Sequence, residues 1–288
     1  MASRADVARL TASCRDRHGV VGALATTLED LGARILTSAQ HSTDPDGGTL
    51  FLRTEFHVAG LRAAWPRVEE RIGSVARKFD MQWRLAPVSD RKRVAVFASK
   101  PEHCLLDLLW RWRRGELEMD VVGVISNHPD HERAVGAFDV PFHEIPFTPE
   151  TKPHAERAQL ELLAGRVDLV VLARYMQILS PGFLERIGVP VINIHHSFLP
   201  AFVGEDPYRR ASERGVKLIG ATAHYVTPDL DEGPIIEQDV HRVWHVHTPG
   251  DLTRFGSDIE RVVLARAVRW HLEDRVLVDA NRTVVFLN

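Results

Sequence analysis

Apolar residues in the first part of the chain recur alternately at strand spacing and at helix spacing. Strand-like runs cover residues 7–13, 33–42, 50–58 and 81–85, and helix-like runs cover 19–31 and 61–79. A cluster of Asp, Pro and Gly at 44–48 marks a turn between the second and third strand-like runs. The order strand, helix, strand, strand, helix, strand predicts a ferredoxin-like βαββαβ domain over residues 1–86.

A second domain is predicted over residues 94–288, after a linker at 87–93 that contains proline, serine and charged residues. Five short β-rich runs occur in this part, at 94–98, 121–126, 167–173, 189–194 and 219–226. Helix-like segments at 104–114, 152–164 and 207–214 separate most of them. This alternation predicts the α/β class, with a mainly parallel sheet that helices cover on both faces.

Composition narrows the possible partners. The 288 residues carry a formal net charge of −3, and the Arg-rich clusters at 91–93 and 111–114 are short and separated, so no nucleic-acid partner is predicted. No apolar run has the length of a signal-peptide core or a membrane span. Cys14 and Cys104 form no CxxC pair, so neither a disulfide framework nor a cysteine metal site is indicated. We therefore expect a cytoplasmic protein.

Three polar residues of the second domain have the chemistry of acyl hydrolysis. Asn193 and His195 lie two residues apart where a strand-like run ends, so both side chains face the same side of an extended segment. Asp231 lies in a loop flanked by Gly and Pro after the next run. An amide and an imidazole can polarise a carbonyl while a carboxylate transfers a proton, and no covalent nucleophile is needed.

Each of these residues also has a structural interpretation. Taken singly, Asn193 is a capping or loop amide and His195 is a core histidine. The alternative for Asp231 is a side chain that stabilises the turn before Gly233, but Asp229 and Glu232 already supply polar groups there. Their coincidence at one predicted crevice favours catalysis. Strand alternation predicts that His196 points away from His195 and has a structural or supporting role.

The first domain resembles an ACT domain. The resemblance rests on residues 14–20 at the first turn and on residues 51–56 in the third strand. Such domains commonly pair and sense small amino acids, so the resemblance implies a homo-oligomer and an amino-acid effector near Asp16 and Gly19. The alternative is that these two residues only cap and open the first helix.

The whole chain resembles the formyltetrahydrofolate deformylases, which join an ACT domain to a formyltransferase-fold domain. Matching segments are residues 99–109, 124–128, 172–180, 217–226 and 258–271. The resemblance implies hydrolysis of 10-formyltetrahydrofolate to formate and tetrahydrofolate, within one-carbon metabolism and purine biosynthesis. The folate is then the substrate, and neither a cofactor nor a metal is expected.

The resemblance also assigns roles to individual residues. Asn193, His195 and Asp231 match the catalytic trio: the first two would donate to the formyl oxyanion, and Asp231 would carry a proton from water toward N10. His224 would orient Asp231, or it is a buried structural histidine. The pterin ring would contact Arg174, Tyr175, Met176, Gln177, Ile178 and Leu179. The alternative for this segment is a strand-to-helix loop with Met176 and Leu179 in the core.

Water is the expected acceptor of the formyl group. Glycinamide-ribonucleotide formyltransferases open this domain with a glycine-rich loop whose backbone amides hold the acceptor's phosphate. Here the first strand is followed by Ser99-Lys100-Pro101-Glu102-His103, and no glycine follows until Gly115. A tRNA acceptor is not favoured, because the chain ends soon after Trp270 without a basic extension.

Two segments depart from the family pattern. Val203 stands where a lysine is usual and is followed by the acidic pair Glu205 and Asp206, while Phe255 and Ser257 stand where basic residues are expected. These departures leave open a divergent paralogue, which is either a formyltransferase to an unidentified amine or a catalytically weakened amino-acid-responsive regulator. Drift of surface loops is the milder explanation.

A metalloenzyme is the remaining alternative, because the chain has 15 histidines and three of them cluster. These are His241, His245 and His247. Their spacing matches no established metal-binding motif, so the sequence gives this alternative little support.

Overall fold

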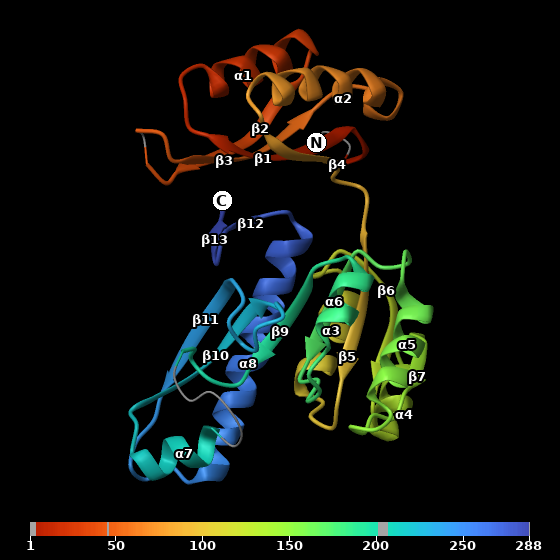
Figure 1. The fold of residues 1–288 in the computed structure, drawn as a ribbon, viewed down its shortest axis with the longest axis vertical. Helices are drawn as coiled ribbons and strands as arrows, with labels where there is room; N and C mark the ends of the chain where they lie inside the picture. The colour runs from red at the N-terminus through yellow and green to blue at the C-terminus, as the bar shows by residue number, and fades with distance from the viewer. Residues whose placement is uncertain (1–3, 45, 201–206, 288) are drawn as a thin grey trace. The chain divides into compact units, whose positions relative to one another are not determined.

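The structure, a computed structural model, describes residues 4–44, 46–200 and 207–287. The chain divides into two compact units (Figure 1). The first comprises the residues up to Arg91, Glu273–Asp279 and the residues from Val284 onward, and the second comprises Lys92–Leu272 and Ala280–Thr283. No helix in the described ranges is both long and apolar enough to cross a bilayer.

The first unit contains a four-stranded antiparallel sheet with two helices on one face (Figure 1). Its elements are η1 Arg4–Asp6, β1 Val7–Arg15, α1 Val20–Asp30, β2 Arg34–Ser42, β3 Thr49–His57, α2 Leu61–Lys78 and β4 Gln82–Pro87. The strand order β2-β3-β1-β4 confirms the predicted βαββαβ arrangement. Its core forms where the apolar faces of the helices meet the sheet, and includes Leu10, Leu24, Phe56 and Ile72.

The second unit contains a seven-stranded sheet of order β11-β10-β9-β8-β5-β6-β7. Its strands are β5 Lys92–Ala98, β6 Met119–Ser126, β7 Phe142–Glu144, β8 Leu169–Ala173, β9 Val191–His195, β10 Leu218–Tyr225 and β11 Ile235–Arg242. Strands β9, β8, β5, β6 and β7 are parallel, whereas β10 is antiparallel to both of its neighbours. The prediction of a mainly parallel sheet is therefore confirmed.

Helices connect the strands of the second unit. They are α3 His103–Arg113, η2 Pro129–His131, α4 Glu132–Gly136, α5 Lys152–Leu163, α6 Pro181–Ile187, α7 Pro207–Arg214 and α8 Pro249–Leu272. The connection from β5 to β6 runs toward one sheet edge and the connection from β8 to β9 runs toward the other. Because such crossovers are right-handed, α3 and α6 cover opposite faces. Helix α3 packs with α8, and α6 packs with α5.

The reversal of strand order between β5 and β8 creates a topological switch point. In open parallel sheets, ligands bind at the carboxyl ends of the strands beside such a reversal. Ser99 follows β5 at this edge, Arg174 follows β8, and His195 ends β9. The fold therefore gathers the predicted catalytic and substrate-binding segments at one edge of the sheet.

Two short strands, β12 Val276–Asp279 and β13 Arg282–Val285, follow α8 and form a separate two-stranded sheet. The end of α8 is anchored within the second unit by the buried Lys92, whose Nζ donates to the carbonyls of His271 (2.7 Å) and Leu272 (2.9 Å). A cation at these carbonyls stabilises the carboxyl end of the helix.

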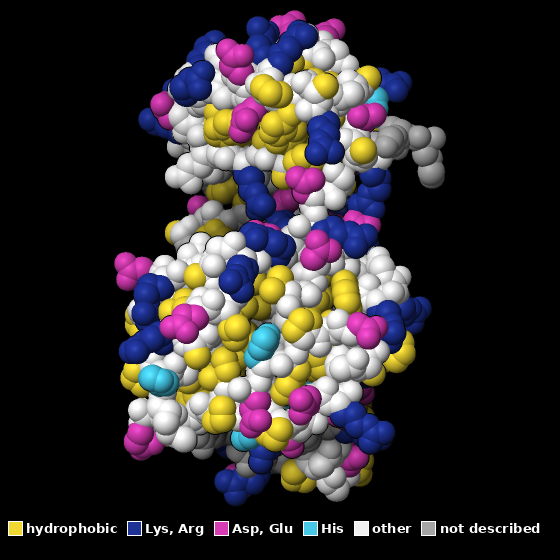
Figure 2. Space-filling view, turned by 90° about the vertical axis from the view of Figure 1, so that its right-hand side faces the viewer, with side chains coloured by type: hydrophobic (Ala, Val, Ile, Leu, Met, Phe, Trp, Pro, Cys, Tyr) yellow, Lys and Arg dark blue, Asp and Glu magenta, His cyan; other side chains and the backbone are white. Residues whose placement is uncertain are grey.

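On the surface that Figure 2 shows, basic and acidic side chains are interspersed, as expected from the small net charge.

Candidate active site

Strands β9 and β10 bring three polar side chains onto one face of the sheet. Asn193 and His195 lie two residues apart on β9, and His224 of β10 lies directly opposite Asn193 in the antiparallel register. The amide nitrogen of Asn193 lies 3.3 Å from Nε2 of His224. A β-bulge between Ala223 and His224 breaks the pairing with β11 at this point, as often occurs next to active sites.

Asp231 enters the site from the loop between β10 and β11. One carboxylate oxygen lies 3.2 Å from Nδ1 of His195, and the other lies 3.6 Å from Nε2 of His224. The Asp231 backbone adopts a left-handed conformation (φ 57°), which aspartate tolerates better than most residues. A hydrogen bond from the Tyr225 N–H to the Pro234 carbonyl closes the loop. Gly233 packs directly against the Tyr225 backbone, where a Cβ would lie 1.8 Å from the Tyr225 carbonyl oxygen.

Electrostatic interactions favour the ionised form of Asp231. Burial by itself would raise the pKa of this carboxyl, but hydrogen bonds and charge interactions with His195 and His224 hold its pKa well below the ordinary value. Asp231 is therefore a carboxylate at neutral pH. It can orient His195, stabilise positive charge on its ring and accept a proton.

His195 and Asn193 have donor capacity directed away from Asp231 and His224. The side chain of His195 is 7 % exposed, and no described group forms a hydrogen bond with its Nε2. A buried polar atom without a partner is uncommon in a protein and is explained well by a role in binding or catalysis. The amide nitrogen of Asn193 has two hydrogens, only one of which can be directed at His224. The pair can therefore donate two hydrogen bonds to one oxyanion.

The prediction that His196 points away from His195 is wrong. The two rings stack with centroids 5.1 Å apart and an interplanar angle of 22°. The reason is that β9 ends at His195, so strand alternation does not extend to the next residue. Burial, Arg174 and His195 together lower the pKa of His196 to about 4, which keeps this imidazole neutral at neutral pH.

The predicted pterin-binding segment is a loop between β8 and α6 with its side chains divided between core and surface. Tyr175 and Leu179 are buried, Arg174 and Gln177 are partly buried, and Met176 and Ile178 are 54 % and 59 % exposed. The alternative that placed both Met176 and Leu179 in the core holds for Leu179 but not for Met176. The exposed pair could cover an apolar ring of a ligand.

Hydrogen bonds to β5 fix the start of this loop. The backbone N–H of Met176 donates to Oγ of Ser99 (3.0 Å), and the Ser99 hydroxyl donates to Oδ1 of Asn127 (2.6 Å). The Ser99 N–H donates to the Arg174 carbonyl (3.3 Å). Deeper in the fold, Gln159 donates to the Tyr175 hydroxyl (3.0 Å). The loop therefore presents an ordered backbone at the carboxyl edge of the sheet.

A buried charged cluster lies at this edge, and of its members only Arg174 has a role expected from the sequence. Glu260 of α8 is 1 % exposed, and its carboxylate lies 2.7 Å from Nε2 of His103, 2.6 Å from the Tyr208 hydroxyl and 3.4 Å from Nε of Arg174. The only signal in the sequence is a glutamate at a position of α8 that otherwise reads as apolar. We call His103, Arg174, Tyr208 and Glu260 the switch-point cluster.

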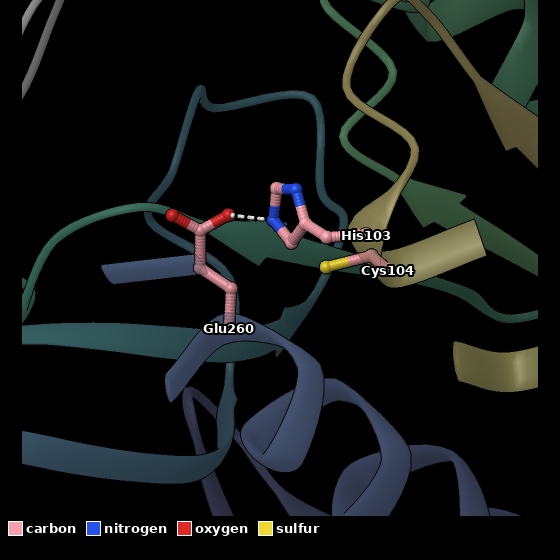
Figure 3. Close-up of side chains that lie close together, drawn as sticks. All are labelled: His103, Cys104 and Glu260. Atoms are coloured by element: carbon pink, nitrogen blue, oxygen red, sulfur yellow. Dashed lines mark hydrogen bonds and ion pairs between the residues drawn. The ribbon is translucent and has the colours of Figure 1, made fainter. Parts of the chain in front are cut away.

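His103, Cys104 and Glu260 could in principle hold a metal ion (Figure 3). One ligand atom from each lies within 4.8 Å of the other two. Burial and the Glu260 carboxylate, however, raise the pKa of the Cys104 thiol well above its ordinary value, which opposes the thiolate that a metal requires. Arg174 already supplies a positive charge beside Glu260, so this group of residues fits an ion pair better than a metal centre.

The other residues singled out from the sequence lie away from these contacts. The ring of Phe255 on α8 packs against His241 and His247, with ring centroids 4.7 Å and 5.1 Å apart. The Ser257 hydroxyl donates to a backbone carbonyl of its own helix. Among the described residues, His241, His245 and His247 do not form a group with metal-binding geometry. Val203, Glu205 and Asp206 lie outside the described residues.

The first unit has a pocket of about 370 Å³ where α1 meets β2 and β3. Its lining includes Asp16, Gly19, His41 and Ser42. The Ser42 hydroxyl donates to the Asp16 carboxylate, and Gly19 precedes α1 with a positive φ of 90°. Both predicted effector residues therefore line one cavity, together with polar groups that could bind a small zwitterion.

Comparisons with known proteins agree over nearly the whole chain. Residues 92–268 match the family model described as formyl transferase. A formyltetrahydrofolate deformylase of Mycobacterium tuberculosis is 62 % identical over 98 % of this chain and 91 % of its own length. The crystal structure of a formyltetrahydrofolate deformylase from Pseudomonas syringae superposes with a TM-score of 0.93 at 46 % identity, covering 97 % of this chain and 94 % of that one.

A second group of solved structures resembles only the larger unit. A glycinamide ribonucleotide transformylase from Symbiobacterium toebii has a TM-score of 0.64 at 31 % identity and covers 68 % of this chain and 94 % of its own.

Proposed function

This chain belongs to the formyltetrahydrofolate deformylase family, and from that premise we propose that Asn193, His195 and Asp231 hydrolyse 10-formyltetrahydrofolate to formate and tetrahydrofolate. One observation carries the proposal. His195 is held by the Asp231 carboxylate through Nδ1, while its buried Nε2 has no hydrogen-bond partner among the described residues. An imidazole oriented in this way can donate to an oxyanion.

The reaction begins when water adds to the formyl carbon and the carbonyl oxygen becomes an oxyanion. Nε2–H of His195 and the amide N–H of Asn193 donate to that oxygen. The ionised Asp231 accepts a proton from the attacking water. Asp231 then returns the proton to N10 as the C–N bond breaks, which leaves formate and tetrahydrofolate.

His224 acts as a positioning residue for the same carboxylate. Its Nδ1 faces the Tyr225 carbonyl (2.9 Å), and its Nε2 faces both Asn193 and Asp231. The ring therefore links the oxyanion donor to the proton carrier, and both are held in one geometry. The side chains supply all the required acid, base and hydrogen-bonding groups, so the folate is a substrate and no cofactor is needed.

The loop Arg174–Leu179 binds the pterin part of the substrate. Met176 and Ile178 provide exposed apolar surface, and the backbone around Met176 is fixed by Ser99. A flat heteroaromatic ring can stack on such side chains while backbone groups bind its polar edge. Nothing in this arrangement requires the long basic surface of a nucleic-acid-binding protein.

The small unit responds to an amino acid and pairs with another copy. Asp16 and Gly19 would bind the effector in the pocket at the start of α1. Exposed Ile35 and Leu36 on the edge strand β2 provide apolar surface for edge-to-edge pairing into a homo-oligomer. Two buried free cysteines suit a reducing cytoplasm. Light scattering tests the oligomer, and a strictly monomeric mass would contradict it.

The hydrolytic assignment is tested by running the reaction in ¹⁸O-labelled water without an amine. Each formate released in the first turnover should carry one oxygen from the solvent, because water attacks the formyl carbon. Release of unlabelled formate would show that the added oxygen has another source. Failure of the wild-type protein to release any formate would refute the proposed activity.

A further inference from the structure

The switch-point cluster places buried charged side chains at the strand ends next to the catalytic trio. His103 follows β5, Arg174 follows β8, and His195 and His196 lie at the end of β9, so the cluster and the trio occupy adjacent strand ends. His196 lies between the cluster and the trio. Its ring stacks on His195, and its ring centroid lies 6.1 Å from that of Tyr208. In this fold class, the same edge of the sheet is where a ligand is expected to bind.

Arg174 adopts a backbone conformation that is unusual for a long side chain. Its φ is 61°, in the left-handed region that is strained for a non-glycine residue. Hydrogen bonds on both sides hold it there, because Ser99 N–H donates to the Arg174 carbonyl and Met176 N–H donates to Ser99 Oγ. Strain that the surroundings maintain in this way points to a function for the side chain.

The strained backbone directs the Arg174 guanidinium into the protein, where its side chain is only 13 % exposed. Nε approaches Glu260 at 3.4 Å, yet neither Nε nor one terminal nitrogen has a hydrogen-bond partner among the described residues. The opposite charges of Arg174 and Glu260 compensate each other. A buried ion pair without net charge has a much smaller cost in desolvation free energy than one unpaired buried charge.

Close packing keeps Tyr208 in the cluster. A Cβ at Gly256 of α8 would lie 2.0 Å from the hydroxyl oxygen of Tyr208 on α7. Helices α7 and α8 can therefore approach this closely only because position 256 is glycine. The hydroxyl of Tyr208 on α7 then donates to Glu260, which lies on α8 one turn after Gly256. The cluster is thus tied to α3, α7, α8 and the loop after β8.

We propose that the switch-point cluster determines acceptor specificity: it occupies the side of the site from which an amine would approach, so water alone reaches the formyl carbon. This inference rests on the proposed hydrolysis. The transformylase from Symbiobacterium toebii has a fold like that of the larger unit, and its name states transfer to glycinamide ribonucleotide, an amine. The fold itself is therefore compatible with either acceptor, and the difference must lie in side chains.

The alternative reaction uses the same catalytic groups. If an amine entered, its nitrogen would attack the formyl carbon, its proton would pass through Asp231 to N10, and the bond between the formyl carbon and N10 would break. The products would be an N-formyl amine and tetrahydrofolate, with no formate. The ratio of N-formyl amine to formate therefore measures access of the acceptor separately from catalytic power.

The test measures both products from 10-formyltetrahydrofolate in the presence of glycinamide as the amine. The double variant Arg174→Gly/Glu260→Gln removes both charges together and replaces the strained arginine with the residue that best accepts a positive φ. Wild type should give formate with N-formyl glycinamide as a trace product at most. The double variant should raise the N-formyl fraction at least about tenfold, the change that a 1.4 kcal/mol lower relative barrier produces. Arg266→Gln, which removes an exposed ion pair from the same helix, should behave as wild type.

Several outcomes would overturn the proposal. A double variant that still releases formate but makes no more N-formyl glycinamide than wild type would show that the cluster does not exclude amines. Tyr208→Phe, which removes only one hydroxyl, provides a second variant if the first does not fold, and it should shift the same ratio in the same direction. Efficient transfer to glycinamide by wild type would refute the inference directly. A wild-type protein that releases no formate without amine would instead refute the proposed hydrolysis.

Discussion

At the scale of single residues, the two nitrogens of His195 define the site. Nδ1 faces an ionised carboxylate, and Nε2 is buried without a hydrogen-bond partner among the described residues. The carboxylate fixes the ring orientation, so the opposite nitrogen is held where it can donate to an oxygen of the substrate. A hydrogen-bond donor held in place before the reaction stabilises a developing oxyanion without reorganisation at the moment of attack.

Asn193→Ala should lower kcat for formate release by about 100- to 1,000-fold, the usual cost of losing one oxyanion donor. The folate KM should change little, because the hydrogen bond forms mainly in the transition state. Steady-state kinetics would check this. A variant with normal kcat and a raised KM would assign Asn193 to substrate binding instead.

His196→Gln should reduce the loss of stability on acidification. Because the folded-state pKa of His196 is lowered to about 4, the unfolded chain binds more protons between pH 6.5 and 4, so wild-type stability falls as the pH falls through that window. The contribution is on the order of 2 kcal/mol after allowance for partial exposure. Urea denaturation at pH 7 and pH 5 would measure it. The exposed His154→Gln serves as the control and should retain the wild-type pH dependence.

The sequence predicts some contacts of the site better than others. Asn193 and His195 could be placed together because a spacing of two residues on a strand puts both on one face. The contact of His224 with Asn193 depends on the register across an antiparallel pair, and a bulge shifts the neighbouring register. Arg174 and Glu260 meet only through tertiary packing over a long sequence separation, so no local pattern indicates their pairing.

At the scale of elements, the loop between β10 and β11 positions the proton carrier. Its geometry depends on the contact between Gly233 and the Tyr225 backbone, which leaves no space for a side chain. The pairing of Tyr225 with Pro234 closes the loop from the other side. The orientation of Asp231 is therefore set by the backbone of the loop as well as by the two histidines.

Gly233→Ala should lower kcat by about 100-fold, since displacing a catalytic group by about 1 Å has effects of that size. The Cβ would lie 1.8 Å from a backbone oxygen, so the loop must move. Kinetics and thermal melting would be compared with Gly136→Ala, whose Cβ would point into open space. That control should keep full activity, and full activity in Gly233→Ala would show that the loop tolerates the shift.

Elements with strong periodicity could be predicted, whereas edge elements could not. The runs that became β5, β6, β8 and β9 are mostly apolar because parallel strands are covered on both faces. Strand β11, with the sequence IIEQDVHR, was not predicted, since an exposed edge strand carries too many polar residues to be distinguished from a loop. Strand β7 is only three residues long and has no detectable pattern.

At the scale of the whole molecule, the chain combines a sheet that carries the candidate catalytic residues with a smaller ACT-like unit. Cys14 lies in the first unit and Cys104 in the second, and both thiols are free and buried. Burial raises the pKa of each, so both should be poorly reactive in the folded protein. Each cysteine therefore reports on the integrity of its own unit.

Titration with a chromogenic disulfide should modify neither thiol rapidly in native protein and both after unfolding in urea. Cys14→Ser and Cys104→Ser would assign each reaction to one unit along the urea gradient. Rapid modification of Cys104 in native protein would contradict its burial against Glu260, and with it the compact packing of the switch-point cluster.

The central claim concerns the combined action of Asn193, His195 and Asp231 on water at a formyl group. The most direct measurement is formate release from 10-formyltetrahydrofolate, without amine, by wild type, Asp231→Asn and the neighbouring loop control Asp229→Asn. We expect turnover by wild type and Asp229→Asn, and a loss of about 100- to 10,000-fold in Asp231→Asn, the range for removal of a general base. Equal turnover by Asp231→Asn and wild type would contradict it.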